Sequence, residues 1–300
     1  MIDVVTPTVI VTPADMRRWS RDVKRMGGSP QADRRIALVA TMGALHAGHM
    51  ALIAAAHSLA DVVVVSIFVN PLQFGESIDF TDYPRPIDAD LAACAHAAVD
   101  AVYAPTAATM YPTGFDTRVL PGAIATTMEG SSRPGHFEGV ATVVIKLLGA
   151  VAPDVAVFGE KDFQQLAIIR RMVADLDLGV DVAGCPTVRE PDGLALSSRN
   201  QRLTRQQREA ATAIPRAIER ARQTARQPDT SIVEMIATAT SVVDAEPLAS
   251  LDYVRVFDAD TLDVVQTIFD SDRMSGRYRI AIAARFGDVR LIDNADLFAR

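Results

Sequence analysis

The sequence predicts an α/β protein in which a doubly wound parallel sheet domain is followed by a smaller α+β domain. Two observations predict the sheet. Short apolar runs alternate with longer helical patterns, and the clearest run, 62–69, fits a strand covered on both faces. Near residue 187 the pattern changes to long charged helices followed by apolar runs around a hairpin turn. We therefore expect domains at 1–187 and 188–300.

The elements of the first domain follow from the spacing of apolar residues. A short strand at 9–11 precedes a helix that Thr12 caps, that Pro13 opens and that runs to about residue 24. Alternating strands and helices imply right-handed crossovers and therefore a parallel sheet. The further expected strands are 36–39, 62–69, 101–103 and 155–158, and the expected helices are 49–59, 88–98, 139–151 and 163–176.

The second domain is expected to start with one long amphipathic helix over 204–226, opened by a capping box of Thr204 and Gln207. The stretch Gln-Pro-Asp-Thr breaks this helix, and a second helix follows over 232–243. Apolar runs at 251–257, 278–285 and 289–292 predict strands, the last two joined by a turn at Phe286-Gly287-Asp288.

The composition excludes several classes of protein. The 300 residues are 49% hydrophobic and 22% charged, which excludes a disordered or collagen-like chain. A net charge of −7 argues against nucleic acid or an anionic membrane as the main partner. Cys94 and Cys185 form no CxxC pair, so neither a disulfide scaffold nor a cysteine-built zinc site is expected. With no signal peptide or membrane-spanning run, we expect a cytoplasmic location.

The first motif with chemical content is the stretch 41–49, Thr-Met-Gly-Ala-Leu-His-Ala-Gly-His, between a strand and a helix. Ligands of doubly wound sheets bind at this end of a strand, and the next helix is expected to offer unpaired N–H groups. His46 and His49 form an H-x-G-H pattern typical of nucleotidyltransferases, in which imidazoles stabilise charge at an α-phosphate. Two such histidines also occur on helix surfaces or as metal ligands, although no third ligand is evident.

Two further polar loops could bind a nucleotide. In the loop 159–162, Lys161 could meet a phosphate and Asp162 the ribose hydroxyls, unless the loop is a plain helix cap. The stretch 192–200 places two hydroxyls and an arginine near the domain boundary, which suits a triphosphate clamp or an ordinary serine-rich linker.

Seven motifs stand in order along the chain and are far more specific together than singly: 41–49, 66–74, 133–137, 139–147, 158–166, 197–200 and 290–294. Through them the chain resembles the pantothenate synthetase (pantoate–β-alanine ligase) family of H-x-G-H nucleotidyltransferases over nearly its whole length. The resemblance implies a Rossmann-like ATP- and pantoate-binding domain, a C-terminal lid domain that closes on the nucleotide, and a homodimer.

The resemblance also implies a ligase reaction in two steps, with ATP as a substrate and Mg²⁺ as a cofactor. The pantoate carboxylate first attacks the α-phosphate, giving pantoyl adenylate and pyrophosphate. The β-alanine amine then attacks the acyl carbon, giving pantothenate and AMP. Because AMP is a good leaving group, the protein mainly positions substrates and stabilises charge.

Three groups of site residues are implied by the resemblance. The catalytic group is His46, His49, Lys161, Ser197, Ser198 and Arg199. The ATP-binding group is the same six with Met42, Gly159 and Asp162, and the pantoate-binding group is Met42, Gln73, Gln165, Val143 and Val144. Asp90 corresponds to the family's acid near magnesium, and Tyr83 to a residue beside the site.

Four positions depart from the family pattern: Ala40, Ala47, Ala89 and Leu196. Because a family acid is missing at Ala89, the magnesium assignment rests on Asp90 alone, whereas Leu196 conserves the volume of a methionine.

Two other functions stay open. Another H-x-G-H adenylyltransferase would present more positive charge than Gln73 and Gln165 offer. A catalytically silent nucleotide-binding protein would have no need to keep His46, His49, Lys161 and Arg199 together. A nucleic-acid-binding module fits the acidic balance least.

Overall fold

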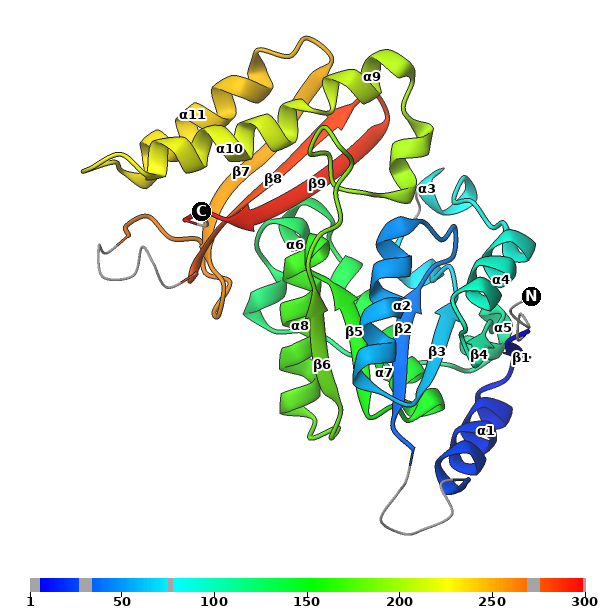
Figure 1. Cartoon of the computed structure of the whole chain (residues 1–300). Helices are drawn as coiled ribbons and strands as arrows, with labels where there is room; N and C mark the ends of the chain where they lie inside the picture. Colours follow the sequence, from blue (N-terminus) through cyan, green and yellow to red (C-terminus); the bar gives the residue numbers. More distant parts are fainter. Residues whose placement is uncertain (1–5, 27–33, 75–77, 269–275, 299–300) are drawn as a thin grey trace. The chain divides into compact units, whose positions relative to one another are not determined.

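The computed structural model describes residues 6–26, 34–74, 78–268 and 276–298 (Figure 1). The chain forms two compact units, neither of which is continuous in sequence. Unit 1 comprises Met1–Pro121, Arg133–Glu160 and Ile168–Pro186, and unit 2 comprises Gly122–Ser132, Lys161–Ala167 and Thr187–Arg300. The division into domains at residue 187 stays a prediction.

Unit 1 is built on a parallel sheet of six strands in the order β1-β4-β3-β2-β5-β6. The predicted α/β class with a doubly wound sheet is thus confirmed. The strand order reverses at β2, which pairs with β3 on one side and β5 on the other, so the switch point of the sheet lies between β2 and β5. The strands are β1 (Thr8–Ile10), β2 (Ile36–Thr41), β3 (Val62–Ile67), β4 (Ala101–Tyr103), β5 (Val155–Gly159) and β6 (Asp181–Cys185).

Helices cover both faces of this sheet because its strands are apolar on both sides. Ile53 of α2 and Cys94 of α4 pack on the face formed by alternate residues such as Val39 and Val65, whereas α7 packs on the opposite face of β2, with α1 against it. The helices of unit 1 are α1 (Pro13–Arg25), α2 (Ala47–Leu59), α3 (Ile78–Thr81), α4 (Ile87–His96), α5 (Ala107–Met110) and α7 (His136–Val151); α8 (Phe163–Asp175) begins in unit 2 and continues in unit 1, and η1 (Pro71–Gln73) is a 3₁₀ turn.

Unit 2 has an antiparallel sheet β7-β8-β9 with α10 and α11 packed on one face. The opposite face carries a smaller core that includes Tyr253, Phe257 and Met128. This arrangement confirms the expected α+β domain. Its elements are β7 (Ala249–Asp258), β8 (Tyr278–Phe286), β9 (Val289–Asp296), α6 (Glu129–Ser132), α9 (Arg205–Ala210), α10 (Ala213–Ala225) and α11 (Ile232–Asp244), with 3₁₀ turns η2 (Ala123–Ala125) and η4 (Ser198–Arg202); a further turn, η3 (Glu160–Asp162), joins β5 to α8.

One expected helix is wrong. The stretch 204–226 forms two helices, α9 and α10, rather than one. Pro215 has no N–H to donate to the carbonyl of Ala211, so a continuous helix would lose a hydrogen bond where the two helices separate. The capping box of Thr204 and Gln207 is confirmed at the start of α9. Strand β6 was not expected from the sequence, because only its last residue is buried.

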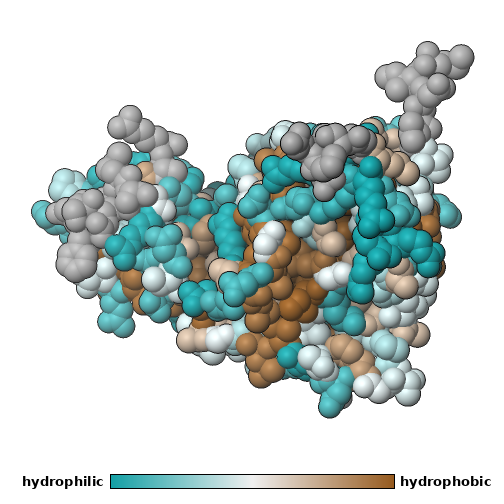
Figure 2. All heavy atoms as spheres, turned by 90° about the horizontal axis from the view of Figure 1, so that it is seen from below, coloured by the Kyte–Doolittle hydropathy of each residue, from teal (hydrophilic) through white to brown (hydrophobic). Residues whose placement is uncertain are grey.

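The hydrophobic residues are not all enclosed. Figure 2 shows a band of them across the face seen from below, bordered by hydrophilic residues. Among the described residues, no helix combines the length and apolar character needed to cross a bilayer.

Helix α7 approaches η1 closely because Gly139 has no side chain. A Cβ built there would collide with the Leu72 carbonyl and lie 2.7 Å from the Gln73 nitrogen. On the same helix, a Cβ on Gly149 would meet nothing within 4 Å. Of these two glycines, packing requires the first and not the second.

We therefore predict opposite effects of alanine at these two positions. Gly139→Ala should lower the free energy of unfolding by about 1–3 kcal/mol, since rigid backbone must move. Gly149→Ala should raise it by about 0.5–1 kcal/mol through helix propensity. Urea unfolding of both variants measures the difference, and equal effects would contradict the packing argument.

Candidate active site

The chain leaves β2 through a turn in left-handed backbone. Gly43 and Ala44 have φ of +82° and +51°, and their conformation turns successive N–H groups toward one point. The Asp90 carboxylate, from α4, occupies that point: its oxygens accept the N–H groups of Ala44 at 2.9 Å and Leu45 at 2.8 Å. Asp90 is only 3% exposed, and these two backbone donors take the place of the water that its carboxylate loses on burial.

The side chains of His46 and His49 both cap the start of α2. Nδ1 of His46 accepts the N–H of Gly48, and Nδ1 of His49 accepts the N–H of His46. The ring centroids lie 4.1 Å apart. Because Nδ1 is an acceptor in both rings, the proton of each neutral imidazole sits on Nε2. The pair therefore presents two Nε2–H donors.

The environment keeps His49 neutral. Burial, assisted by the neighbouring His46, lowers the pKa of His49 from 6.5 to about 3. The expectation of unpaired N–H groups in this turn is wrong for Ala44, Leu45, His46 and Gly48, since side chains already accept them. An anion here would be met by imidazole N–H groups instead.

Gln73 lies beside this turn with its amide already oriented. Its Oε1 accepts from Asn70 at 3.0 Å, so its Nε2 faces the Met42 sulfur at 3.1 Å. Asn70 is itself fixed by Tyr111, whose hydroxyl donates to Asn70 Oδ1 at 2.7 Å. The contact with a thioether is weak, so the Gln73 Nε2–H can exchange it for a ligand oxygen.

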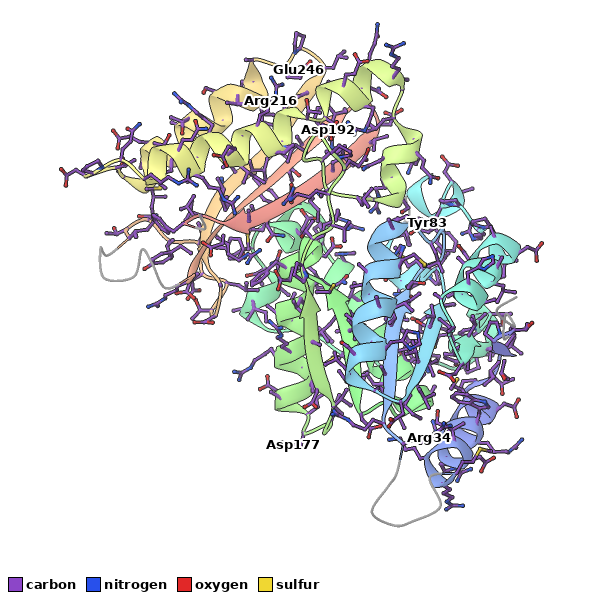
Figure 3. The ribbon with its side chains drawn as sticks, in the orientation of Figure 1. Arg34, Tyr83, Asp177, Asp192, Arg216 and Glu246 are labelled. Carbon is purple, nitrogen blue, oxygen red and sulfur yellow. The ribbon has the colours of Figure 1, made fainter. Side chains whose placement is uncertain are left out.

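Unit 1 holds four further predicted residues. Val143 and Val144 are buried on α7, the helix that packs against η1 and thus next to Gln73. Tyr83 lies between α3 and α4 with its ring edge against Phe74 (Figure 3). Gly159 ends β5, which neighbours β2 at the switch point.

Unit 2 carries the remaining predicted residues. Lys161 and Asp162 lie in the 3₁₀ turn η3 that follows Gly159, with 3.9 Å between the ammonium and the carboxylate. The carbonyl of Lys161 accepts a hydrogen bond of 2.8 Å from the Asn294 amide. This backbone contact fixes the loop and leaves the Lys161 ammonium for other partners.

The adjacent glutamines of α8 have different roles. Gln164 is buried, donates to the carbonyls of Ile124 and Thr127 at 2.9 Å each, and accepts the N–H of Glu129. Gln165 is half-buried, and its amide has no hydrogen-bond partner in the part of the chain that the structure describes. Gln164 thus holds the segment 122–132, whereas the Gln165 amide is not used in this way by the described residues.

The predicted clamp Ser197, Ser198 and Arg199 follows a short hairpin. Arg189 and Ala195 face each other across it, and Ser197 then caps η4 by accepting the N–H of Arg199. Asn200 donates to Glu190 at 3.1 Å, while Arg208 binds both Glu190 and Asp192, the second of which is labelled in Figure 3. The stretch is therefore a built turn rather than a plain linker.

The residues do not fit a resident magnesium site. Both oxygens of Asp90 already accept backbone N–H groups, and the described residues contain no group of three His, Cys, Asp or Glu side chains that could hold a metal ion. As a magnesium ligand Asp90 stays a prediction, and its geometry fits the support of the turn after β2.

The structure divides the predicted site residues between the two units. Unit 1 contains Met42, His46, His49, Gln73, Val143, Val144 and Gly159, and unit 2 contains Lys161, Asp162, Gln165, Ser197, Ser198 and Arg199. Sequence reasoning gave no role to Asn70, Gln164 or Asn294, although each lies within a motif. Their buried amides could not be recognised without the backbone groups that they bind.

The chain is similar to known proteins along nearly its whole length. The model of the family described as pantoate–β-alanine ligase matches residues 8–296. The pantothenate synthetase of Trichlorobacter lovleyi is 47% identical over 283 residues, covering 94% of this chain and 96% of the relative.

Two solved structures are similar along their whole length. The pantothenate synthetase of Thermus thermophilus is 41% identical with a TM-score of 0.87, covering 97% of this chain and 100% of that one. The pantoate–β-alanine ligase of Francisella tularensis, complexed with β-γ ATP and β-alanine, is 35% identical with a TM-score of 0.77, covering 98% and 99%. The resemblance of the motifs is confirmed, and the chain belongs to the pantoate–β-alanine ligase family.

Proposed function

We propose that this chain condenses pantoate with β-alanine in an ATP-dependent reaction that passes through pantoyl adenylate. In the first step a bond forms between a pantoate carboxylate oxygen and the α-phosphorus, and pyrophosphate leaves. In the second step the β-alanine nitrogen bonds to the acyl carbon, AMP leaves and the amine loses a proton. The family membership supports the overall reaction.

The two histidines are the main observation that supports the first step. Two Nε2–H donors at the carboxyl end of β2, at the switch point of the sheet, suit a phosphate on which negative charge grows. Being neutral, His49 donates without first needing a proton. Met42 and Gln73 would hold pantoate beside them, with Val143 and Val144 against its methyl groups.

The residues of unit 2 would serve the nucleotide. Lys161, Ser197, Ser198 and Arg199 would neutralise the phosphates, since an ammonium, two hydroxyls and a guanidinium fork all bind phosphate oxygens. Gly159 and Asp162 would contact the ribose. Gln165 would bind pantoate through the amide that has no partner in the described structure.

The proposal is tested by separating the half-reactions. Pantoate and ATP without β-alanine should release pyrophosphate, and AMP should appear only when β-alanine is added. His46→Ala should slow pyrophosphate release by on the order of 10²–10³ without unfolding the chain. Near-normal release by this variant would remove the histidine from the mechanism.

A homodimer, Mg²⁺ and a cytoplasmic location complete the proposal. The hydrophobic band in Figure 2 is the kind of surface that a second copy could cover. Both cysteines are buried and free, which fits a reducing compartment. Mg²⁺ would bind together with the triphosphate. Sedimentation equilibrium tests the homodimer, and a titration of the reaction rate with Mg²⁺ tests the requirement for the ion.

The low pKa of His49 predicts acid sensitivity. Between about 3 and 6.5 the unfolded chain binds a proton that the folded chain does not, so stability due to His49 is complete above pH 6.5 and falls below it. His49→Gln should therefore lose less stability than the unchanged chain between about pH 7 and about pH 4. Urea unfolding at both values measures this, and identical losses would contradict a neutral buried His49.

The two glutamines of α8 predict a contrast. Gln165→Ala should weaken pantoate binding by about 1–3 kcal/mol and leave the melting temperature unchanged. Gln164→Ala should lower the melting temperature, because three backbone groups lose their partner. Pantoate titrations and calorimetry of both variants decide, and a loss of stability alone in Gln165→Ala would contradict its assignment.

Asp90→Asn separates support of the turn from metal binding. The amide would turn an NH₂ group toward a backbone N–H, so stability should fall by about 1–3 kcal/mol and pyrophosphate release should slow. Raising the Mg²⁺ concentration should not restore the rate. Restoration by Mg²⁺ would instead show that Asp90 acts as a metal ligand.

A further inference from the structure

Strand β9 carries two adjacent polar residues that are almost completely buried. Asp293 is 3% exposed and Asn294 is 4% exposed. Successive side chains of a strand point to opposite faces, so Asp293 lies on the side of Leu291 and Ala295, which pack with the helices, and Asn294 on the side of Ile292. The two residues therefore bind different segments.

Asn294 holds the loop of Lys161. Its Nδ2 donates to the Lys161 carbonyl at 2.8 Å, and its Oδ1 accepts from the Arg279 guanidinium at 3.0 Å and 2.7 Å. That guanidinium also lies 4.2 Å from the centroid of the Phe163 ring. Because Arg279 occupies the oxygen, the nitrogen of the amide must face Lys161, and both ends of this short loop are fixed.

Asp293 holds the hairpin that leads to Ser197. Its carboxylate accepts two hydrogen bonds from Arg189, at 2.6 Å and 3.0 Å, and Arg189 also donates to the Gly193 carbonyl at 2.9 Å. The same carboxylate accepts the N–H of Asn294 at 2.8 Å. The two anchors are thus joined to each other.

A buried strand gains little stability from such residues. Buried polar groups lose the free energy of hydration, and the hydrogen bonds to their partners at most offset that loss. The neighbouring positions Leu291, Ile292 and Ala295 carry apolar side chains, which have no such cost. Paired polar groups have directional geometry, however, and so specify where a loop must lie. Both loops anchored here carry proposed phosphate ligands.

We propose that Asp293 and Asn294 are positioning residues, which hold the Lys161 loop and the Ser197–Arg199 turn in register for the first half-reaction. The inference rests on the proposed function. Neither residue contacts substrate in this proposal; Asn294 acts through Lys161, and Asp293 acts through Arg189 and the hairpin.

Asn294→Asp tests the first anchor, since it keeps an acceptor for Arg279 and removes the donor to Lys161. We expect pyrophosphate release from pantoate and ATP to fall, or KM for ATP to rise, by about tenfold or more. Amide formation from supplied pantoyl adenylate should stay within about twofold. In a Lys161→Ala background the same change should have no further effect, because the side chain that it positions is gone.

Asp293→Asn tests the second anchor in the same way, with Arg199→Ala as the background. The matched control is Asp258→Asn, which weakens the ion pair between another buried aspartate, at the end of β7, and Arg277. The control should lower the melting temperature and leave KM for ATP unchanged. Should Asp293→Asn not fold, Arg189→Lys tests the same anchor, because the Arg189 side chain is 31% exposed.

Three results would overturn the inference: equal damage to both half-reactions, equal effects with and without the background substitution, or a rise in KM for ATP in the control. Failure of the unchanged chain to release pyrophosphate from pantoate and ATP is a different result. It would overturn the proposed function and, with it, the role assigned to both anchors.

Discussion

The candidate site depends on one buried carboxylate. After β2 the backbone is left-handed at Gly43 and Ala44, a conformation that costs energy for alanine and turns two N–H groups inward. Asp90 accepts both. With this turn fixed, His46 reaches the extended conformation of a helix cap, and both imidazole rings follow from the first turn of α2.

This arrangement changes what an anion would meet. A strand–turn–helix commonly offers backbone N–H groups to phosphate, but here the donors of the turn are already bound by Asp90 and by the two rings. The donors offered by the two histidines are instead their Nε2–H groups. A side-chain donor can be shaped around a reacting phosphate, and two rings at 4.1 Å place their donors close together.

Much of the fold followed from the sequence because its strands are apolar and its helices begin with recognisable caps, as at Thr12 and Thr204. Strand β6 was not predicted, because its partial burial leaves no pattern of apolar residues in the sequence. The amphipathic spacing of 204–226 predicted one helix, whereas the structure has two, with Pro215 near the start of the second. The histidines and the two glutamine positions could be predicted from motifs. The structural role of Gln164 could not be predicted, because only the folded backbone shows which groups its amide binds.

The interleaved course of the chain has a consequence for its biosynthesis. Glu129 forms a two-point ion pair with Arg290, which stands 161 residues later, and Tyr253 donates to the same carboxylate. During translation this acid emerges long before its partners, so unit 2 cannot reach its final packing until β9 has left the ribosome. The last strand thus completes unit 2, because a nascent chain that lacks it has neither the Arg290 partner of Glu129 nor the Asn294 partner of the Lys161 loop.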